Sequence, residues 1–242
     1  MIIQKFGGVA MRDQKSRATC IQHIKNAINI HKNVIVVVSA MGRTGDPYST
    51  DTLLHLSDAF KQAPKSQVAA ICGQLLAISV LSAELLRENV HCHLAYGVQA
   101  GLFTDDNFGE ASILKTSPDS INEILQIVPC VIVPGFQGVT TDNRFTTLGR
   151  GGSDLTAIIM AVLFKSKSVE FYKDVPGVMT EDPKKNQDAK MLEKVTYNEL
   201  LKYCQKGHPV VQKKAVEMAA KNQIHLHIRQ FGSESEGTHV FP

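Results

Sequence analysis

The sequence predicts an α/β protein, folded as a three-layer α/β/α sandwich around a mostly parallel central sheet. Apolar runs typical of strands alternate with helical patterns along the whole chain. The run at 33–40, NVIVVVSA, is continuously apolar and β-branched, as expected of a strand buried on both faces of a parallel sheet. Strands separated by helices need right-handed crossovers, and these crossovers place helices on both faces of the sheet.

The first half of the chain is predicted to form strand and helix units. Residues 1–6 are expected to form a strand. Residues 12–30 are expected to form a helix, because apolar side chains recur on one face at Ala18, Ile21, Ile24, Ala27 and Ile28. The strand at 33–40 precedes a polar, glycine-rich loop and a long apolar helix at about 68–87. Alternation at 90–94 indicates a strand with His91 and His93 on one side.

The second half continues this alternation. A helix at 120–127 leads into a strand that starts at 130, and the loop TTLGRGGSD precedes a helix at 155–164. Ser153 or Asp154 is expected to be the N-cap of that helix. A strand at 167–174, helices at 198–206 and 210–222, and a strand at 224–231 follow. His225 and His227 alternate on this last strand, which predicts partly exposed side chains without a catalytic role.

Composition limits the class of protein. With 242 residues, of which 43% are hydrophobic and 20% charged, the chain is expected to form one domain or two tightly joined lobes. The net charge is +3 and the basic residues are scattered, which argues against a nucleic-acid partner. Small anionic ligands remain compatible with this charge.

The cysteine and histidine patterns indicate a reduced protein without a resident metal. Five cysteines lie far apart with no CxxC pair, so neither a disulfide framework nor a zinc knuckle is expected. The nine histidines show no HExxH or facial-triad spacing, and no protein-bound transition metal is expected. No signal peptide and no apolar run of membrane-spanning length is recognised, so a cytoplasmic protein with no membrane contact is predicted.

Three glycine-rich turns follow predicted strands and are expected to form one phosphate-binding crevice: KFGG, PGFQG and LGRGGSD. Lys5 would add a mobile charge, and Arg150 a planar donor pair for a carboxylate. No Walker A or GxGxxG motif occurs. The residues alone also allow plainer interpretations, namely a solvated lysine at a strand end and an ordinary capped helix.

The chain resembles the catalytic domain of aspartate kinases, in the amino acid kinase superfamily, over nearly its whole length. The resemblance is carried by KFGG, VVVSAMG, GFQG, TTLGRGGSD, KDVPGVMTEDP and HIRQFGSESEGTHV, in that order. It implies the carbamate kinase-like fold in a single domain, 1–242, with a substrate lobe at about 1–150 and a nucleotide lobe at about 151–242. The ACT regulatory domains that usually follow are not expected in this chain.

The resemblance also implies an activity. Such enzymes use ATP and Mg²⁺ to phosphorylate the side-chain carboxylate of L-aspartate to 4-phospho-aspartate, the first step towards lysine, threonine and methionine. A carboxylate with a pKa of about 3.9 is already ionised at neutral pH, so no general base is needed. The implied partners are aspartate or a similar acid, ATP, and a second copy of the chain or another aspartokinase subunit.

Site residues follow from matching motifs. Lys5 and Asp154 are implied to be catalytic, and Lys5 is also implied to contact the ATP phosphates. Substrate binding is implied for Ser39, Gln74, Phe136, Arg150 and Ser153. Nucleotide binding is implied for Gly7, Gly8, Lys173, Asp174, Val178, Asp182, Pro183 and Lys184.

Several positions depart from the family pattern. Val9 and Ala10 stand where the family has two hydroxyl residues, and Gln74 stands where a glutamate meets the amino group of the substrate. Pro209 stands where the family has a lysine that approaches the ATP phosphates. Lys184, Lys206 or Lys213 would have to supply that positive charge instead. Two alternatives therefore stay open: an impaired paralogue that binds nucleotide or a partner, and a kinase for another acidic substrate.

Overall fold

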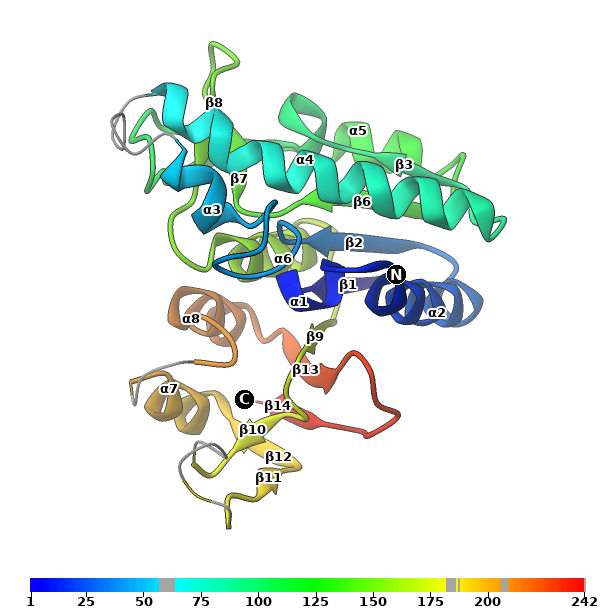
Figure 1. Cartoon of the computed structure of the whole chain (residues 1–242), viewed down its shortest axis with the longest axis vertical. Coiled ribbons are helices and arrows are strands. Elements are labelled where there is room, and N and C mark those ends of the chain that lie inside the picture. Colours follow the sequence, from blue (N-terminus) through cyan, green and yellow to red (C-terminus); the bar gives the residue numbers. More distant parts are fainter. Residues whose placement is uncertain (57–63, 182–185, 187, 206–208, 242) are drawn as a thin grey trace.

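An eight-stranded sheet forms the centre of the computed structural model, which describes residues 1–56, 64–181, 186, 188–205 and 209–241 (Figure 1). The strand order is β12-β14-β13-β9-β1-β2-β6-β3. The strands are β1 (Ile2–Phe6), β2 (Val34–Val38), β3 (Cys92–Leu94), β6 (Cys130–Pro134), β9 (Ser168–Lys173), β12 (Lys194–Thr196), β13 (His225–Gln230) and β14 (Thr238–Phe241). Only the β13–β14 pairing is antiparallel among these described strands, which confirms the predicted, mostly parallel sheet.

The central strands are buried on both faces, as their apolar sequences predict. Every residue of β1, β2 and β6 is buried, including the polar Gln4 and Lys5 of β1. Side chains alternate across a strand, so Gln4 and Lys5 point to opposite faces of the sheet. A buried lysine in a central strand needs a partner for its charge, and this requirement leads to the site described below.

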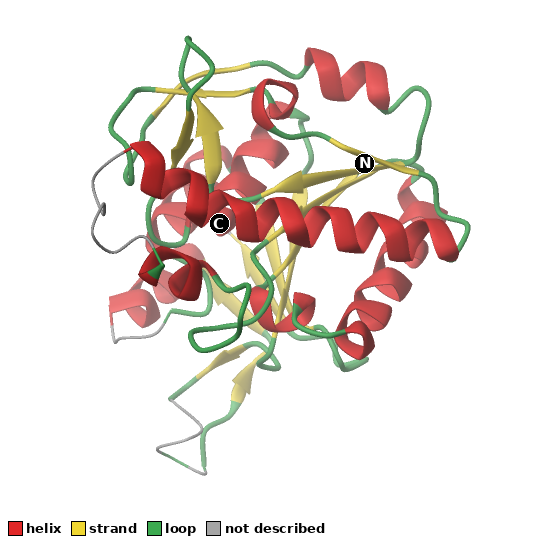
Figure 2. Cartoon of the chain, turned by 45° about the horizontal axis from the view of Figure 1, so that its top comes forward, coloured by secondary structure: helices red, strands yellow, loops and turns green. Residues whose placement is uncertain are grey.

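Helices cover both faces of the sheet, and each face has its own hydrophobic core (Figure 2). On one face, α2 (Gln14–His31) and α4 (Pro64–Arg87) pack on the strands, with α1 (Gly8–Met11) beside α2 and α3 (Thr50–His55) beside α4. The other face carries α5 (Asp119–Ile124), α6 (Gly152–Leu163), α7 (Tyr197–Gln205) and α8 (Lys213–Asn222). The predicted three layers are therefore present.

Smaller elements extend the two ends of the molecule. A four-stranded sheet of order β5-β4-β7-β8 contains β4 (Leu102–Thr104), β5 (Ile113–Thr116), β7 (Gln137–Val139) and β8 (Phe145–Thr147), with the 3₁₀ turn η2 (Gly97–Ala100) nearby. A short hairpin joins β10 (Val178–Met179) to β11 (Met191–Leu192). In Figure 1 the small sheet and the hairpin lie at opposite ends of the long axis.

A buried ion pair ties the helices of one face together. The guanidinium of Arg17 on α2 donates to both oxygens of Glu84 on α4, at 2.7 and 2.8 Å. It also donates to the carbonyl of Met11, at the end of α1, at 3.0 Å. Both side chains are about nine-tenths buried. A buried pair of this kind leaves an uncompensated charge when one partner is removed, so it fixes the positions of α1, α2 and α4.

The expectation that no segment has the length and apolarity of a membrane span is wrong. Within α4, residues Val68–Arg87 have a mean hydropathy of 1.8 over a window long enough to cross a bilayer. The buried side of this helix, including Ile78, Leu81 and Leu85, packs in the core against the sheet. We therefore interpret α4 as a core helix, whose apolarity reflects its burial.

Candidate functional site

Four neighbouring parallel strands end at the same edge of the central sheet. After β1, the amide of Gly7 donates to the carbonyl of Tyr172 in β9 at 3.3 Å. The amide of Ser39, after β2, donates to the carbonyl of Phe6 at 3.1 Å. The amide of Gly135, after β6, donates to the carbonyl of Val38 at 2.9 Å. These hydrogen bonds hold the loops after the four strands side by side, at the edge where open α/β sheets bind ligands.

Glycines allow these loops to approach one another closely. A Cβ atom built on Gly8 would lie 2.2 Å from the carbonyl oxygen of Gly42. One built on Gly135 would lie 2.5 Å from the Cβ of Ser153, at the beginning of α6. Such distances exclude any side chain at these two positions unless the backbone moves. The KFGG and PGFQG turns are therefore required for the packing of the loops around the site.

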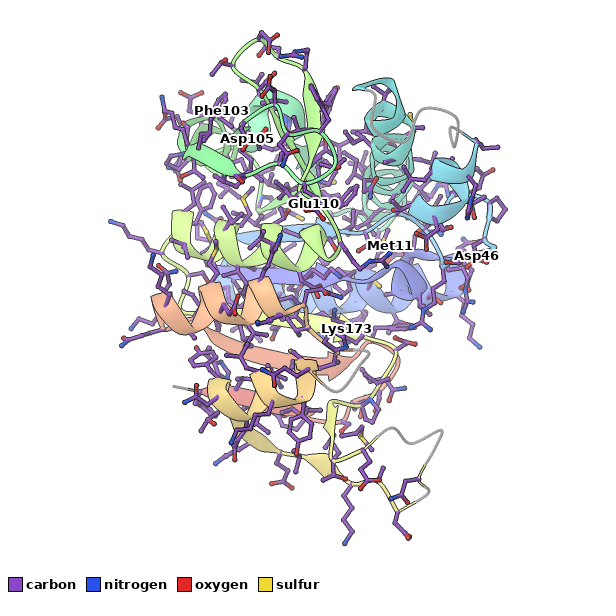
Figure 3. The ribbon with its side chains drawn as sticks, turned by 90° about the vertical axis from the view of Figure 1, so that its left-hand side faces the viewer. Met11, Asp46, Phe103, Asp105, Glu110 and Lys173 are labelled. Atoms are coloured by element: carbon purple, nitrogen blue, oxygen red, sulfur yellow. The ribbon has the colours of Figure 1, made fainter. Side chains whose placement is uncertain are left out.

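A buried carboxylate lies between two lysines at this edge. Figure 3 labels one of these lysines, Lys173. Asp154, in the first turn of α6, accepts from the ammonium of Lys5 at 2.8 Å. It also accepts from the ammonium of Lys173, the last residue of β9, at 3.0 and 3.1 Å. The amide of Gln212, just before α8, donates to the same carboxylate at 3.2 Å. The side chains of Lys5 and Asp154 are only 5% exposed.

This cluster carries a net positive charge in a dry environment. Burial by itself opposes ionisation of Asp154, but the ammonium groups of Lys173 and Lys5 outweigh it and hold the pKa of Asp154 well below its usual range. Burial lowers the pKa of Lys173 to about 8, opposed by Asp154 and assisted by the charge of Lys5. One carboxylate thus accompanies two cations, which favours binding of an anion beside them.

The predicted N-cap of α6 is wrong. Helix α6 begins at Gly152, its N-cap is Gly151 at φ 77°, and neither Ser153 nor Asp154 caps it. Both residues therefore lie inside the first turn. The carboxylate of Asp154 turns inward because the buried lysines are stronger partners for it than the free amides of the helix.

The residues implied to bind the substrate approach the site from several loops. The hydroxyls of Ser39 and Ser153 lie 3.0 Å apart. Phe136, at φ 75°, packs its ring against Gly152, and its amide donates to the hydroxyl of Thr156 at 3.1 Å. Hydrogen bonds thus bring three of the predicted residues together around the N-terminus of α6, and two of them, Ser39 and Ser153, lie 114 positions apart in the chain.

Gln74 is buried on α4, with 2% of its surface exposed. Its amide group lies 3.1 Å from the hydroxyl of Thr50, at the start of α3. Turned by 180°, the same group accepts from Thr50 and donates to the carbonyls of Ala70 and Ile71, which satisfies both of its polar atoms. The preceding Gly73 packs against the loop after β2. Gln74 therefore supports the loop that contains Ser39.

Arg150 lies in an exposed turn between Gly149 and Gly151, both at positive φ, four residues before Asp154. The role predicted for Arg150 in binding the substrate stays a prediction. Asp174, the residue after β9, forms an ion pair with Arg43 at 2.6 Å. This contact between the loops after β2 and β9 was not predicted from the sequence.

The remaining predicted nucleotide residues are located only in part. Val178 is buried in the core, and its amide donates to the hydroxyl of Thr238 at 2.8 Å. Asp182, Pro183, Lys184 and Lys206 lie outside the described residues. Lys213 pairs with Glu217 at 3.5 Å on the exposed side of α8. Two of the three lysines considered as replacements for the one lost at Pro209 are therefore outside the described residues. The third, Lys213, pairs with Glu217 and not with Asp154.

Lys173 supplies the second ammonium instead. The alternation of Val169, Phe171 and Lys173 along β9, together with the pairing of Lys5 and Phe171, places Lys173 on the same face of the sheet as Lys5. The sequence shows this alternation, and the structure adds the pairing. The contact of the Gln212 amide with Asp154 gave no signal in the sequence, because any residue has a backbone amide.

The fold and the site define an α/β protein with a buried cationic cluster at the carboxyl edge of a parallel sheet. Residues 1–230 match the Amino acid kinase family. The chain is 38% identical over 243 residues to aspartokinase 1 of Bacillus subtilis, covering 99% of this chain and 60% of that protein. This chain belongs to the amino acid kinase family.

Solved structures agree with this assignment. An aspartate kinase from Synechocystis superposes with a TM-score of 0.82 at 29% identity, over 100% of this chain and 40% of that one. Aspartokinase III of E. coli, in complex with aspartate and ADP, has the same fold, with a TM-score of 0.78 at 24% identity over 100% and 64% of the two chains. The chain spans about 60% of the length of the curated relatives it matches.

Proposed function

We propose that this chain is an aspartate kinase catalytic domain, which transfers the terminal phosphoryl group of ATP to the side-chain carboxylate of L-aspartate. The observation that carries the proposal is the buried cluster of Lys5, Asp154 and Lys173 at the carboxyl edge of the sheet. The similarity to aspartokinases over 99% of the chain supports the choice of substrate. The same similarity supports action in the cytoplasm, on a free amino acid.

The two ammonium groups suit phosphoryl transfer. Charge spreads over the oxygens of the transferring group in the transition state, so catalysis depends on positioning and on compensating charge. Lys5 and Lys173 would supply that charge from a site shielded from water, where it acts most strongly. Asp154 holds both ammonium groups in place through bonds of 2.8 to 3.1 Å. Its part is positioning, since an ionised acceptor carboxylate needs no base.

The metal in this proposal arrives with the nucleotide. Both oxygens of Asp154 already accept hydrogen bonds, from two lysines and the amide of Gln212, so this carboxylate is a poor metal ligand. Mg²⁺ usually keeps several waters and binds mainly through phosphate oxygens in such sites. When bound, it would neutralise part of the phosphate charge.

The loss of the family lysine at Pro209 is compensated in this proposal by Lys173. The resemblance implies a threonine at position 173, and here the ammonium of Lys173 lies on the same carboxylate as that of Lys5. A cation that enters from β9 would reach the phosphates from a different direction from one on the segment before α8. The lysine gained at position 173 and the lysine lost at position 209 then leave the number of cations at the site unchanged.

A hydroxamate assay tests this function. Purified protein with MgATP and L-aspartate is expected to form an acyl phosphate, which hydroxylamine traps as a hydroxamate that gives a coloured complex with added Fe³⁺. Lys5→Met should abolish the signal, whereas Lys15→Met, at an exposed position of α2, should not change it. Binding of ATP in calorimetry without any product would instead indicate a non-catalytic nucleotide-binding protein. Turnover of another dicarboxylate in preference to aspartate would indicate a different acceptor.

A further inference from the structure

A cluster of three histidines and one glutamate lies on the sheet face away from α6. Strand alternation places Leu226, Ile228 and Val240 in the core under α6, α7 and α8, so the neighbouring side chains of β13 and β14 face the opposite side. These side chains are His225, His227 and His239, and Glu236 from the loop between the two strands faces them. We call this set the histidine cluster.

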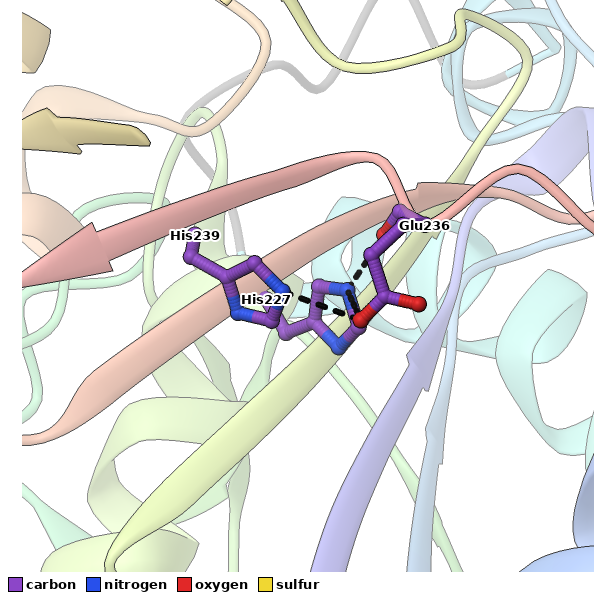
Figure 4. Close-up of side chains that lie close together, drawn as sticks. All are labelled: His227, Glu236 and His239. Atoms are coloured by element: carbon purple, nitrogen blue, oxygen red, sulfur yellow. Dashed lines mark hydrogen bonds and ion pairs between the residues drawn. The ribbon is translucent and has the colours of Figure 1, made fainter. Parts of the chain in front are cut away.

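The polar atoms of the cluster converge (Figure 4). The Nε2 atom of His239 lies 3.0 Å from Oε1 of Glu236, and that of His227 lies 3.8 Å from the same oxygen. One ligand atom from each of these three residues lies within 4.8 Å of the other two. The two imidazole rings are stacked with centroids 4.0 Å apart, so both present a nitrogen towards Glu236.

We propose that the histidine cluster binds a divalent transition-metal ion, with Zn²⁺ as its best fit, through His227, His239 and Glu236. Zinc takes nitrogen ligands at about 2.0–2.1 Å and oxygen ligands at about 2.0–2.2 Å in a tetrahedral arrangement, which places neighbouring ligand atoms about 3.3 Å apart. The separations of 3.0 and 3.8 Å bracket that value. Three protein ligands leave one position for water.

His225 supplies the outer-shell partner that such sites commonly contain. Its Nε2 atom lies 3.0 Å from Nδ1 of His239. With zinc on Nε2 of His239, the Nδ1 atom carries the proton and donates it to His225. This hydrogen bond fixes the tautomer and the ring orientation of the ligand, and it raises its basicity. The arrangement therefore has both a ligand set and a second shell.

Two further charged side chains lie beside the histidine cluster. Glu170 and Arg229 also face His227, and their charges have opposite effects on a bound cation.

Two contacts must change when the metal binds. Without metal, Nε2 of His227 donates to the backbone carbonyl of Glu236, and Nε2 of His239 donates to the carboxylate of the same residue. A ligand nitrogen has to present a lone pair, so both bonds break and the proton of each ring moves to its other nitrogen. The side chain of Glu236 is 74% exposed on its loop and is free to adjust. Binding would therefore fix the loop onto the β13–β14 hairpin.

Calorimetric titration of untagged, metal-free protein with Zn²⁺ tests the proposal. We expect one bound zinc per chain and a higher thermal midpoint of unfolding in its presence. His239→Ala is expected to weaken binding by at least about tenfold, since even loss of an outer-shell partner costs 10–100-fold. Because that variant could lose folding, Glu236→Gln, at an exposed position, serves as the second test with the same expected direction.

Control variants separate this site from other zinc ligands. His91→Ala removes an exposed histidine next to Cys92 and should leave zinc binding unchanged. The visible spectrum of Co²⁺ bound in place of zinc should show a nitrogen and oxygen ligand set without a thiolate band. Protons compete for imidazole nitrogen, so affinity should fall as the pH drops below neutral. The proposal is overturned if wild type binds no zinc, or if folded His239→Ala and Glu236→Gln proteins bind it as wild type does.

Discussion

Replacing Lys173 by methionine removes one of the two ammonium groups at the candidate site while keeping a side chain of similar length. Lys5 and its contact with Asp154 at 2.8 Å remain. A charge about 4 Å from a phosphate oxygen contributes about 4 kcal/mol at an effective dielectric constant of about 20. Loss of one preorganised donor in other enzymes costs about 2.7–4 kcal/mol, or 10²–10³ in kcat. We expect a decrease in kcat of about that size.

The pH dependence gives an independent measurement of the same residue. The pKa of Lys173 is about 8 in the folded protein, so its positive charge is lost as the pH rises through that value. The kcat/KM for ATP should therefore decrease above about pH 8 in wild type. Lys173→Arg keeps its charge at all accessible pH values and should lack this decrease.

Stability should respond to pH in the opposite direction. The usual pKa of 10.5 for lysine applies in the unfolded chain, so between about pH 8 and 10.5 the unfolded state binds more protons at Lys173 than the folded state does. The free energy of unfolding of wild type should rise over this window relative to Lys173→Met, as measured by urea denaturation.

Two outcomes would refute the reasoning about Lys173. An unchanged kcat in folded Lys173→Met would mean that the second ammonium does not contact the transferring group. Lys167 is exposed and lies just before β9. A decrease of the same size in Lys167→Met would mean that kcat depends on the net charge of the protein and not on the position of the Lys173 ammonium. Steady-state assays at saturating aspartate distinguish these results from an effect on substrate binding.

Three further substitutions and one control test other parts of the structure. The resemblance implies that residue 74 meets the substrate ammonium, so Gln74→Glu should lower the KM for aspartate by at least about tenfold; an unchanged KM would show that the amine is not bound there. Glu84→Gln should lower the free energy of unfolding by about 3–5 kcal/mol in urea, since it leaves a buried guanidinium unpaired. Glu88→Gln, at an exposed pair, should cost less than about 1 kcal/mol, and equal losses in both variants would contradict the distinction. Gly135→Ala should reduce kcat by about 10²-fold, because its Cβ would collide with that of Ser153 and displace α6; full activity would refute the role of this close approach.

Much of the fold was predictable from local pattern. Continuous apolar runs identified β2 and β6, and a strand-like run that contains Gln4 and Lys5 identified β1. Helical spacing identified α2, and a long apolar stretch identified α4. Burial requires these patterns whatever the rest of the chain does. The glycine-rich turns also indicated which strand ends form the site. Boundaries were less certain: α6 starts at Gly152, three residues earlier than predicted, since its first turn is stabilised by contacts with other segments.

The contacts within the site depended on pairing across the chain. The sequence suggested Lys5 and Asp154 as catalytic residues, but not that they touch each other, nor that Lys173 joins them. The histidine cluster was missed for the same reason, because its members fit no short metal motif and meet only through the β13–β14 pairing.

The sequence by itself determined the alternation of strands and helices, the three turns at the strand ends and the residues that depart from the family pattern. Only the tertiary structure decided which charges are buried together, and so which pKa values shift. Secondary structure depends on neighbours a few residues apart. The energy of a buried charge depends instead on atoms within a few ångströms, and here these come from β1 and from α6 and β9, which follow β1 by more than a hundred residues.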